Sequence, residues 1–470
     1  MGSPRGHGTR SAGKLRTWGR ARGDDALGGE TLAGSTKSAA TTATKLTRIA
    51  QMSQERPDCE LRWLMPHFNV ESLKACVNEL DRKKAVGADG MNKDDYQVDL
   101  DERLGDLVAR MKKLSYRPGP VREVLIPKEG RPGEVRPLGI SNLEDKVVQS
   151  MTAKILGAIY EPTFRDCSYG FRPNRSCHTA IKALSTFLHQ HQYSTVIDID
   201  LKNYFGSIDH EKLVEMLRHR VKDETFIRYI VRMLKAGVLS DGELRMSEEG
   251  SPQGNVASPI LSNIYGHYVI DCWFEDTVKP HCRGRVELVR YCDDMVIICQ
   301  LRHDAERIMT ALEKRLAKFS LGLNHDKTRL VWFSRKGLDR GKRQGTFDFL
   351  GFTFYIGKTQ KGGLTTKLKT SRKRLRSKLG KVKIWLSENY CRVRLSELWK
   401  VFVKKLQGHA RYYGVSFNTP SVNEFLWRAR RLFFKWINRR SQKRSLNWSQ
   451  FDQFTQRHPL PTAKVYVPLF

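Results

Sequence analysis

The 470-residue sequence has no run of apolar residues long enough to cross a membrane. Its longest apolar stretches are strand-length, as at 295–299, whereas a membrane-spanning helix needs about 20 apolar residues. Residues 1–45 also lack the apolar segment of a secretory signal. We therefore expect a cytoplasmic protein with no membrane partner.

Paired cysteines are missing as well. The nine cysteines are odd in number and scattered, without a CxxC pair and without the Cys/His spacing of a metal finger. This pattern indicates reduced thiols rather than a disulfide framework. There is no internal repeat.

Negative charge is scarce. Lys and Arg together number 83 and Asp and Glu 50, for a formal net charge of +33. Because no membrane anchor accompanies it, an excess of this size predicts a polyanionic partner, which is nucleic acid.

Composition and periodicity divide the chain into three parts. Residues 1–55, rich in Gly, Ser, Thr, Ala and Arg, are expected to be a disordered basic arm. In 56–360, helices (69–83, 101–114, 143–160, 210–236, 258–276, 303–319) mix with strands (121–127, 135–140, 196–201, 289–299, 347–355) without a βαβ repeat. Residues 361–470 read as a basic helical domain with interleaved aromatics. The sequence predicts an α+β fold with an antiparallel sheet.

Acidic residues interrupt two of the expected strands. Asp198 and Asp200 end one strand and share a face, because side chains alternate along a strand. Asp293 and Asp294 interrupt the apolar stretch 288–298, which is expected to be a strand or a hairpin. Carboxylates in such places favour Mg²⁺, with Mn²⁺ as a substitute. Two such ions serve in-line phosphoryl transfer, so Asp200, Asp293 and Asp294 are the expected catalytic metal ligands. Taken singly, each Asp also fits a turn cap or an ion pair with Arg.

With these acids in place, the chain resembles reverse transcriptases, and most closely the bacterial group II intron-encoded reverse transcriptase and maturase family. The resemblance runs from about 61 to 461 and rests first on 200–205 (DLKNYF), 251–259 (SPQGNVASP) and 291–294 (YCDD). Further matches are 88–90 (ADG), 126–128 (IPK), 136–140 (RPLGI), 169–176 (YGFRPNRS), 322–324 (GLN), 327–328 (KT) and 349–352 (FLGF). The resemblance implies a right-hand polymerase: fingers, an antiparallel palm and a helical thumb.

The same resemblance implies roles for six residues around an incoming nucleotide. Lys128 and Arg136 would hold its triphosphate, as cations do, and Phe205 would be a gate against a 2′-hydroxyl. Gln253 and Gly254 would let the backbone approach the nucleotide, because Gly has no Cβ. Lys327 would protonate the departing pyrophosphate. Solvated charges, core packing, a plain turn and a surface ion pair are the respective structural alternatives.

Two positions depart from the family pattern. The family usually has Ala at the position of Cys292 and an acid at that of Gly206. Cys292 is expected near the primer end, where it would tune metal preference or fidelity. Neither departure removes a proposed metal ligand.

The basic C-terminal part resembles the maturase-associated domain in 406–414 (LQGHARYYG) and 436–442 (WINRRSQ). Arg and Lys with aromatics suit RNA. The expected RNA contacts are Arg172, Arg175, Arg411, Tyr412, Arg439 and Arg440. His409 is read as structural. Tyr412, Tyr413, Trp427, Phe433 and Trp436 are, taken singly, more typical of a core than of a base platform.

The leading hypothesis is therefore an RNA-directed DNA polymerase with RNA template, DNA primer and dNTPs as partners. A second activity would be binding a group II intron RNA to assist splicing and mobility in the bacterial cytoplasm, near the nucleoid. Without Cys/His clusters or further nuclease-like acids near residue 470, no endonuclease domain is expected. A host-adapted enzyme of DNA repair or phage defence, a splicing cofactor with inactive polymerase, and an RNA-dependent RNA polymerase stay as alternatives. Oligomeric state is left open.

Overall fold

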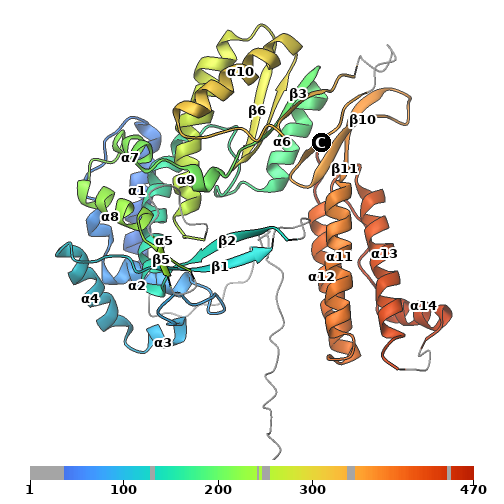
Figure 1. Cartoon of the computed structure of the whole chain (residues 1–470), viewed down its shortest axis with the longest axis horizontal. Coiled ribbons are helices and arrows are strands. Elements are labelled where there is room, and N and C mark those ends of the chain that lie inside the picture. The colour runs from blue at the N-terminus through green and yellow to red at the C-terminus, as the bar shows by residue number, and fades with distance from the viewer. Residues whose placement is uncertain (1–35, 128–132, 241–242, 246–253, 336–343, 442–445) are drawn as a thin grey trace, which may run out of the picture. The chain divides into compact units, whose positions relative to one another are not determined.

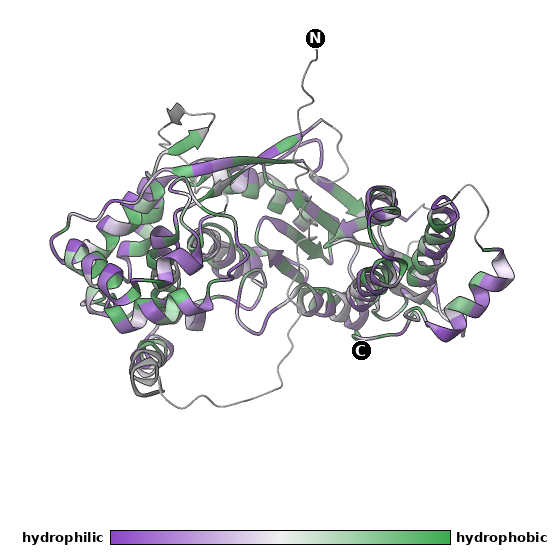
Figure 2. Ribbon diagram, turned by 90° about the horizontal axis from the view of Figure 1, so that it is seen from below, coloured by the Kyte–Doolittle hydropathy of each residue, from purple (hydrophilic) through white to green (hydrophobic). Residues whose placement is uncertain are grey.

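Helices and strands alternate irregularly along the chain, which confirms the α+β prediction. The computed structural model describes residues 36–127, 133–240, 243–245, 254–335, 344–441 and 446–470, which belong to one unit, 36–470 (Figure 1). In Figure 2, hydrophobic and hydrophilic bands alternate along the helices, the pattern of helices with one buried face. No helix among the described residues is both long and apolar enough to cross a bilayer.

The N-terminal helices correct one prediction. Residues 36–55, expected in a disordered arm, form helix α1 (Thr36–Glu55), and residues 1–35 lie outside the described part. Ile49 is buried in the same core as α5, and the buried Ser53 accepts a hydrogen bond from Arg220 Nη2 at 3.1 Å. Tertiary packing, which composition does not report, orders this segment. The following helices are α2 (Val70–Glu79), α3 (Lys93–Gln97), α4 (Leu100–Lys112) and α5 (Leu143–Tyr160).

A four-stranded sheet, called here the hairpin sheet, has the order β2-β1-β4-β5. Its strands are β1 (Val121–Pro127), β2 (Val135–Ile140), β4 (Val238–Ser240) and β5 (Glu243–Arg245). The predicted hairpin is confirmed by antiparallel pairing of β1 with β2, in which Ile126 faces Arg136. The β1–β4 pair is parallel.

A second four-stranded sheet, called the central sheet, has the order β6-β7-β3-β8, with every pairing antiparallel. Its strands are β3 (Thr195–Asp200), β6 (Val286–Tyr291), β7 (Asp294–Cys299) and β8 (Arg329–Trp332). Side chains alternate between two separate cores: Ile197 and Ile297 pack into one, Val196 and Val296 into the other. Both faces are therefore covered.

Helices α6 (Cys177–Gln190) and α10 (Arg302–Lys318) contact the central sheet, and α7 (His210–Arg218) packs against α8 (Glu224–Leu234) and α9 (Ser258–Gly266). The single helix predicted at 210–236 is two helices, because the Asp223 side chain caps a new N-terminus by accepting from Phe226 N. After α9 the chain continues through two π-helical segments, η4 (His267–Asp271) and η5 (Phe274–Val278).

The predicted strand 347–355 is a hairpin instead, and the acidic stretch 288–298, expected to be a strand or a hairpin, is a hairpin. Cys292 at φ +59° turns the chain between β6 and β7, and Leu350 at φ +48° with Gly351 at φ +86° turns it between β9 (Phe347–Phe349) and β10 (Phe352–Lys358). Apolar residues continue on both sides of each turn, so the hydrophobic pattern does not show the reversal.

The C-terminal helices are α11 (Arg372–Asn389), α12 (Leu395–Tyr413), α13 (Thr419–Ile437) and α14 (Trp448–Arg457). They begin later than the predicted boundary at 361, which falls between β10 and β11 (Leu364–Thr370), two paired strands. One core joins Val296 of the central sheet to Phe354 of β10 and Phe402 of α12. The helices therefore share a core with the sheet and do not form a separate globule.

Candidate active site

The predicted acidic residues meet on one face of the central sheet. Asp200 pairs directly with Asp294 across β3 and β7, and Asp198 pairs with Val296. Because side chains alternate, Asp198, Asp200 and Asp294 lie on the face that carries Val196 and Val296. Asp293 occupies the turn that leads into β7. The pairing of β3 with β7 thus brings together acids that are about ninety residues apart in the sequence.

The turn that carries Asp293 is fixed by contacts of Cys292 with Gly170 and Arg290. Cys292 is buried with φ +59°, and its Sγ and N would lie 2.3 and 2.7 Å from a Cβ placed on Gly170. Its carbonyl accepts a hydrogen bond from Arg290 Nη1 at 3.2 Å. Glycine at 170 is therefore required by this close approach. The Cys292 side chain packs into the protein against Gly170.

Charge accumulates on this face. Loss of hydration, followed by the charges of Asp293 and Asp198, raises the pKa of Asp294 to about 7. The pKa of Asp293 is raised by loss of hydration and by Asp200, and that of Asp198 by burial, which Arg329 at 3.1 Å opposes. The raised pKa values of Asp293 and Asp294 indicate that these two carboxylates favour a further cation.

The loop before β8 supplies one cation. Lys327 Nζ lies 2.7 and 2.9 Å from the two carboxylate oxygens of Asp200. The same loop fixes the Asp200 backbone, since Asn324 N and Thr328 Oγ1 donate to its carbonyl at 2.8 and 3.2 Å. Lys327 and Asp200 are about equally exposed, at 41% and 40%. The structure thus shows the ion pair named above as the structural alternative, within the cluster of acidic residues.

The donor set fits magnesium chemically. Asp200, Asp293 and Asp294 present hard carboxylate oxygens, which Mg²⁺ prefers, and the raised pKa of Asp294 marks a place where a cation would relieve repulsion. As the side chains stand, no three His, Cys, Asp or Glu residues of the described part are grouped closely enough to hold an ion. Lys327 occupies the oxygens of Asp200 that a metal would use.

The residues expected around a nucleotide fall into three groups. Lys128 and Gln253 lie outside the described residues. Arg136 is exposed on β2, and Gly254 has φ +117° with its Cα so close to β2 that an added Cβ would lie 2.2 Å from Gly139 O. Phe205 follows Asp200 in a 3-10 turn and is partly buried. Their nucleotide contacts stay predictions.

The conformation of Asn203 explains why glycine occupies position 206. Asn203 has φ +47°, and its side-chain nitrogen would lie 2.3 Å from a Cβ on Gly206. Tyr204 beside it is buried and donates through its hydroxyl to Ser262 O at 2.7 Å. The turn that carries Phe205 is thus fixed by Tyr204, and a side chain at 206 would displace Asn203.

Arg172, an expected RNA contact, is buried and ion-paired. Its side chain is 5% exposed, pairs with Glu161 at 2.8 Å and donates to the carbonyls of Arg165 and Ser168. A cation buried and paired in this way has a structural role, and its RNA contact stays a prediction. Arg175 pairs with Asp166 at 2.6 Å and is 23% exposed, and its RNA contact stays a prediction.

Tyr412 is also structural. Its hydroxyl donates to Leu350 O at 2.9 Å, and its ring lies 5.3 Å from that of His178. It therefore anchors α12 to the β9–β10 turn, and its RNA contact stays a prediction. Arg411 and Arg439 are exposed and Arg440 is half-buried, so their RNA contacts stay predictions. Tyr413 and Phe433 are buried as expected, and so is His409.

One pair of residues beside the site was not foreseen. Arg290, in β6, and Asp271, in η4, form an ion pair in which neither side chain is exposed. The signal was present in the sequence, because an Arg in the apolar stretch 286–291 requires a buried acid. Nothing local identifies Asp271 as that acid, since it is 19 residues away on a helical segment.

Comparisons with known proteins agree with this geometry. Residues 126–354 match the family model described as reverse transcriptase (RNA-dependent DNA polymerase). The chain is 34% identical to Protein YkfC of Escherichia coli K12 over 277 residues, 52% of this chain and 71% of that protein. It is 34% identical to the group II intron-encoded protein LtrA of Lactococcus lactis over 223 residues, 47% of this chain.

A third similar protein is the putative COX1/OXI3 intron 1 protein of Saccharomyces cerevisiae, 34% identical over 245 residues. That match covers 50% of this chain and 28% of the yeast protein. The match to the Lactococcus lactis protein covers 37% of its length. The chain thus spans little more than a third of the first relatives it matches.

Proposed function

Because the chain belongs to the reverse transcriptase family, in the group that includes group II intron-encoded proteins, we propose that it is an RNA-directed DNA polymerase. The observation that carries the proposal is the pairing of Asp200 with Asp294 across β3 and β7, with Asp293 in the adjoining turn. Two-metal nucleotidyl transfer needs such a cluster of carboxylates on a rigid support.

We assign Asp200, Asp293 and Asp294 to hold Mg²⁺. When bound, the metal ions would activate the primer hydroxyl and neutralise charge on the triphosphate. The protein's own contribution is to fix the carboxylates: β3 and β7 align two of them, and Asn324 and Thr328 hold the Asp200 backbone. Lys327 holds a proton 2.7 Å from Asp200, where it would be given to the departing pyrophosphate.

The polymerase parts follow the sheets and helices. The β1–β2 hairpin with Arg136 would act as fingers over the triphosphate, together with Lys128. The central sheet would be the palm, and α11–α14 the thumb and maturase domain. Gly254 supports this assignment, because its approach to Gly139 brings this residue of the expected nucleotide loop against the β1–β2 hairpin.

RNA template, DNA primer and dNTPs are the proposed substrates, and an intron RNA is a proposed partner. The net charge of +33 supports a polyanionic ligand. Arg411 and Arg439, exposed on α12 and just after α13, are positioned to contact phosphates. Aid to splicing rests on the likeness to intron-encoded proteins and is proposed with that likeness as its support.

Primer extension on an RNA template with dNTPs and Mg²⁺ tests the proposal. Asp293→Asn should abolish extension while leaving RNA affinity within about twofold, because a neutral amide no longer attracts the metal but keeps its shape. Asp101→Asn, which changes an exposed acid on α4, is the matched control and should extend normally. Unchanged extension by Asp293→Asn would refute the metal assignment.

A further inference from the structure

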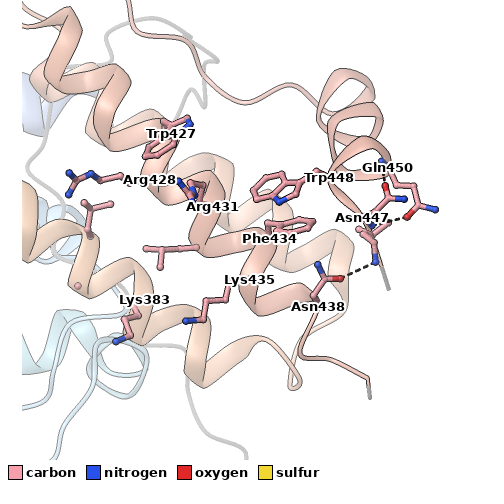
Figure 3. A pocket seen from close by; sticks show the side chains of 14 residues that line it. Lys383, Trp427, Arg428, Arg431, Phe434, Lys435, Asn438, Asn447, Trp448 and Gln450 are labelled. Atoms are coloured by element: carbon pink, nitrogen blue, oxygen red, sulfur yellow. Dashed lines mark hydrogen bonds between the residues drawn. The ribbon is translucent and has the colours of Figure 1, made fainter. Parts of the chain in front are cut away.

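A hollow of about 980 Å³ lies between α11, α13 and α14, on elements that carry none of the carboxylates above. One face of α13 forms much of its wall: Trp427, Arg431, Lys435 and Asn438 recur every three or four residues. Figure 3 shows the indoles of Trp427 and Trp448 along one side of the view and the amines of Lys383 and Lys435 along the other.

Two aromatic rings border this hollow without being buried in it. Trp427, expected to be a core residue, is 54% exposed, and the Arg431 guanidinium lies 4.6 Å from its ring centroid. Trp448 is 44% exposed and stacks on Phe434, with centroids 3.8 Å apart and planes at 23°. Indoles backed by another group and still open to solvent can stack against a planar ligand.

The lining is basic. Lys383, Arg428, Arg431 and Lys435 contribute four cations, and among the described residues that line the hollow none is Asp or Glu. Two acids near the hollow are held in ion pairs: Glu424 pairs with Arg428 at 2.7 Å, and Asp452 pairs with Arg430. Three or four positive charges therefore face a ligand that must be anionic.

Three carboxamides add donors. Asn438 Oδ1 accepts from Leu446 N, Asn447 Oδ1 from Gln450 N, and Gln450 Oε1 from Asn447 N, each at 2.9 Å. Because the oxygens are engaged by backbone N–H groups, the NH₂ ends are the groups left to bind a ligand. Cations, NH₂ donors and open indoles together suit a molecule that is anionic, rich in acceptors and planar in part.

We propose that this hollow binds single-stranded RNA, with an unpaired base stacked on Trp427 and phosphates on Lys383 and Lys435. A duplex does not fit, because its bases are already stacked and paired. An acidic peptide would satisfy the cations but not the indoles. The identity of the strand as RNA rests on the proposed function, whereas the preference for an unpaired strand follows from the lining itself.

The test uses the full chain and an unstructured 12-nucleotide RNA labelled for fluorescence anisotropy. A saturating primer–template hybrid duplex is present, so that the polymerase site is filled. Trp427→Ala should weaken binding about tenfold, since base–aromatic stacking is of that order. Trp427→Phe should retain binding. Trp63→Ala, which removes a tryptophan that is 82% exposed outside the hollow, is the control and should bind normally.

A second variant blocks the hollow without removing a ligand group. A Cβ on Gly380, in α11, would meet nothing within 4 Å, so Gly380→Leu adds a side chain to the hollow without a clash. Leu is also a better helix former than Gly. Binding should fall about tenfold or more. Gly105→Leu in α4, where a Cβ likewise has open space, is the matched control.

The number of phosphate contacts is measured from the salt dependence of the affinity for the 12-nucleotide RNA. Replacing both Lys383 and Lys435 by Gln should lower the slope of log K against log salt by about 1.4, that is, about 0.7 per contact for a single strand. Lys400→Gln with Lys404→Gln, two exposed lysines of α12 outside the hollow, removes the same charge and should leave the slope unchanged.

Wild-type affinity in both Trp427→Ala and Gly380→Leu would overturn this proposal, and so would duplex RNA that competes as well as the single strand. The proposed polymerase is judged separately by primer extension. If the chain extends primers and the variants bind the 12-nucleotide RNA as the wild type does, the proposed RNA site in the hollow is refuted and the polymerase is not. If the variants bind the 12-nucleotide RNA more weakly but the wild-type chain extends no primer, the proposed polymerase is refuted and the RNA site is not.

Discussion

Arg290 and Asp271 form an ion pair with both side chains fully buried, 2.5 Å between Arg290 Nη2 and Asp271 Oδ2. Arg290 also donates to Ser168 Oγ at 2.8 Å and to Cys292 O at 3.2 Å. One guanidinium therefore ties the π-helical segment η4 to the turn that carries Asp293. π-Helical distortions often occur at functional positions, and here the distortion places Asp271.

Asp271→Asn should lower the free energy of unfolding by about 3–5 kcal/mol, because it leaves the Arg290 charge buried without its counter-ion. Urea denaturation measures this change. The matched control is Glu306→Gln, which breaks the exposed Arg302–Glu306 pair and should cost less than about 1 kcal/mol. Equal, small losses in both variants would contradict the assigned role of the buried pair.

The positions of the carboxylates and the order of the elements could be predicted, because both follow from the local spacing of apolar and acidic residues. The bounds of β1, β2 and α5 match the sequence prediction, and the two acidic stretches do meet. What the sequence could not predict depends on distant partners: Arg172 is paired with Glu161, and the Tyr412 hydroxyl donates to Leu350 O. A basic or aromatic residue in a motif looks the same in sequence whether its partner is RNA or another part of the chain.

Lys327 competes with a metal for Asp200. Lys327→Gln should lower the Mg²⁺ concentration that gives half-maximal primer extension by several-fold, because it removes a positive charge 2.7 Å from a ligand oxygen. The maximal rate should fall by about 10² or more, since the proton donor is lost. Lys202→Gln, an exposed lysine two residues after Asp200, is the control for charge alone. A higher Mg²⁺ requirement would contradict the competition.

Phe205 is proposed to exclude ribonucleotides, and its turn is fixed independently by Tyr204. Phe205→Ala should therefore raise incorporation of NTPs relative to dNTPs by about tenfold or more without unfolding the turn. Single-nucleotide extension with each substrate measures the ratio. If the ratio does not change, the gate is another residue. Phe319→Ala, a partly buried aromatic of the same core, controls for loss of packing.

Gly254 has a conformation that other residues do not tolerate. Its φ is +117°, and an added Cβ would lie 2.2 Å from Gly139 O, so Gly254→Ala should force the loop away from β2. We expect KM for dNTPs to rise at least about tenfold. Gly133→Ala is the control, because Gly133 has φ +86° but open space around it. Similar kinetics in both variants would show that the close approach to β2 does not matter.

His409 makes the C-terminal helices sensitive to acid. Its ring stacks on Phe425, with centroids 3.4 Å apart, and burial lowers its pKa to about 3 from an ordinary 6.5. The unfolded chain then binds the proton more readily. The contribution of the neutral His409 imidazole to the free energy of unfolding is complete above pH 6.5 and is lost as the pH falls toward 3. At pH 5 the free energy of unfolding is lower by about 2 kcal/mol.

The variant His409→Phe should remove that pH dependence, because phenylalanine stacks on Phe425 but does not titrate. Urea denaturation of the two proteins at pH 7 and pH 5 gives the comparison. The wild type should lose about 2 kcal/mol more than the variant between these values. His325, which is 73% exposed, provides the control, and His325→Phe should lose as much stability as the wild type. Parallel losses in wild type and His409→Phe would mean that the buried imidazole is protonated in the folded chain.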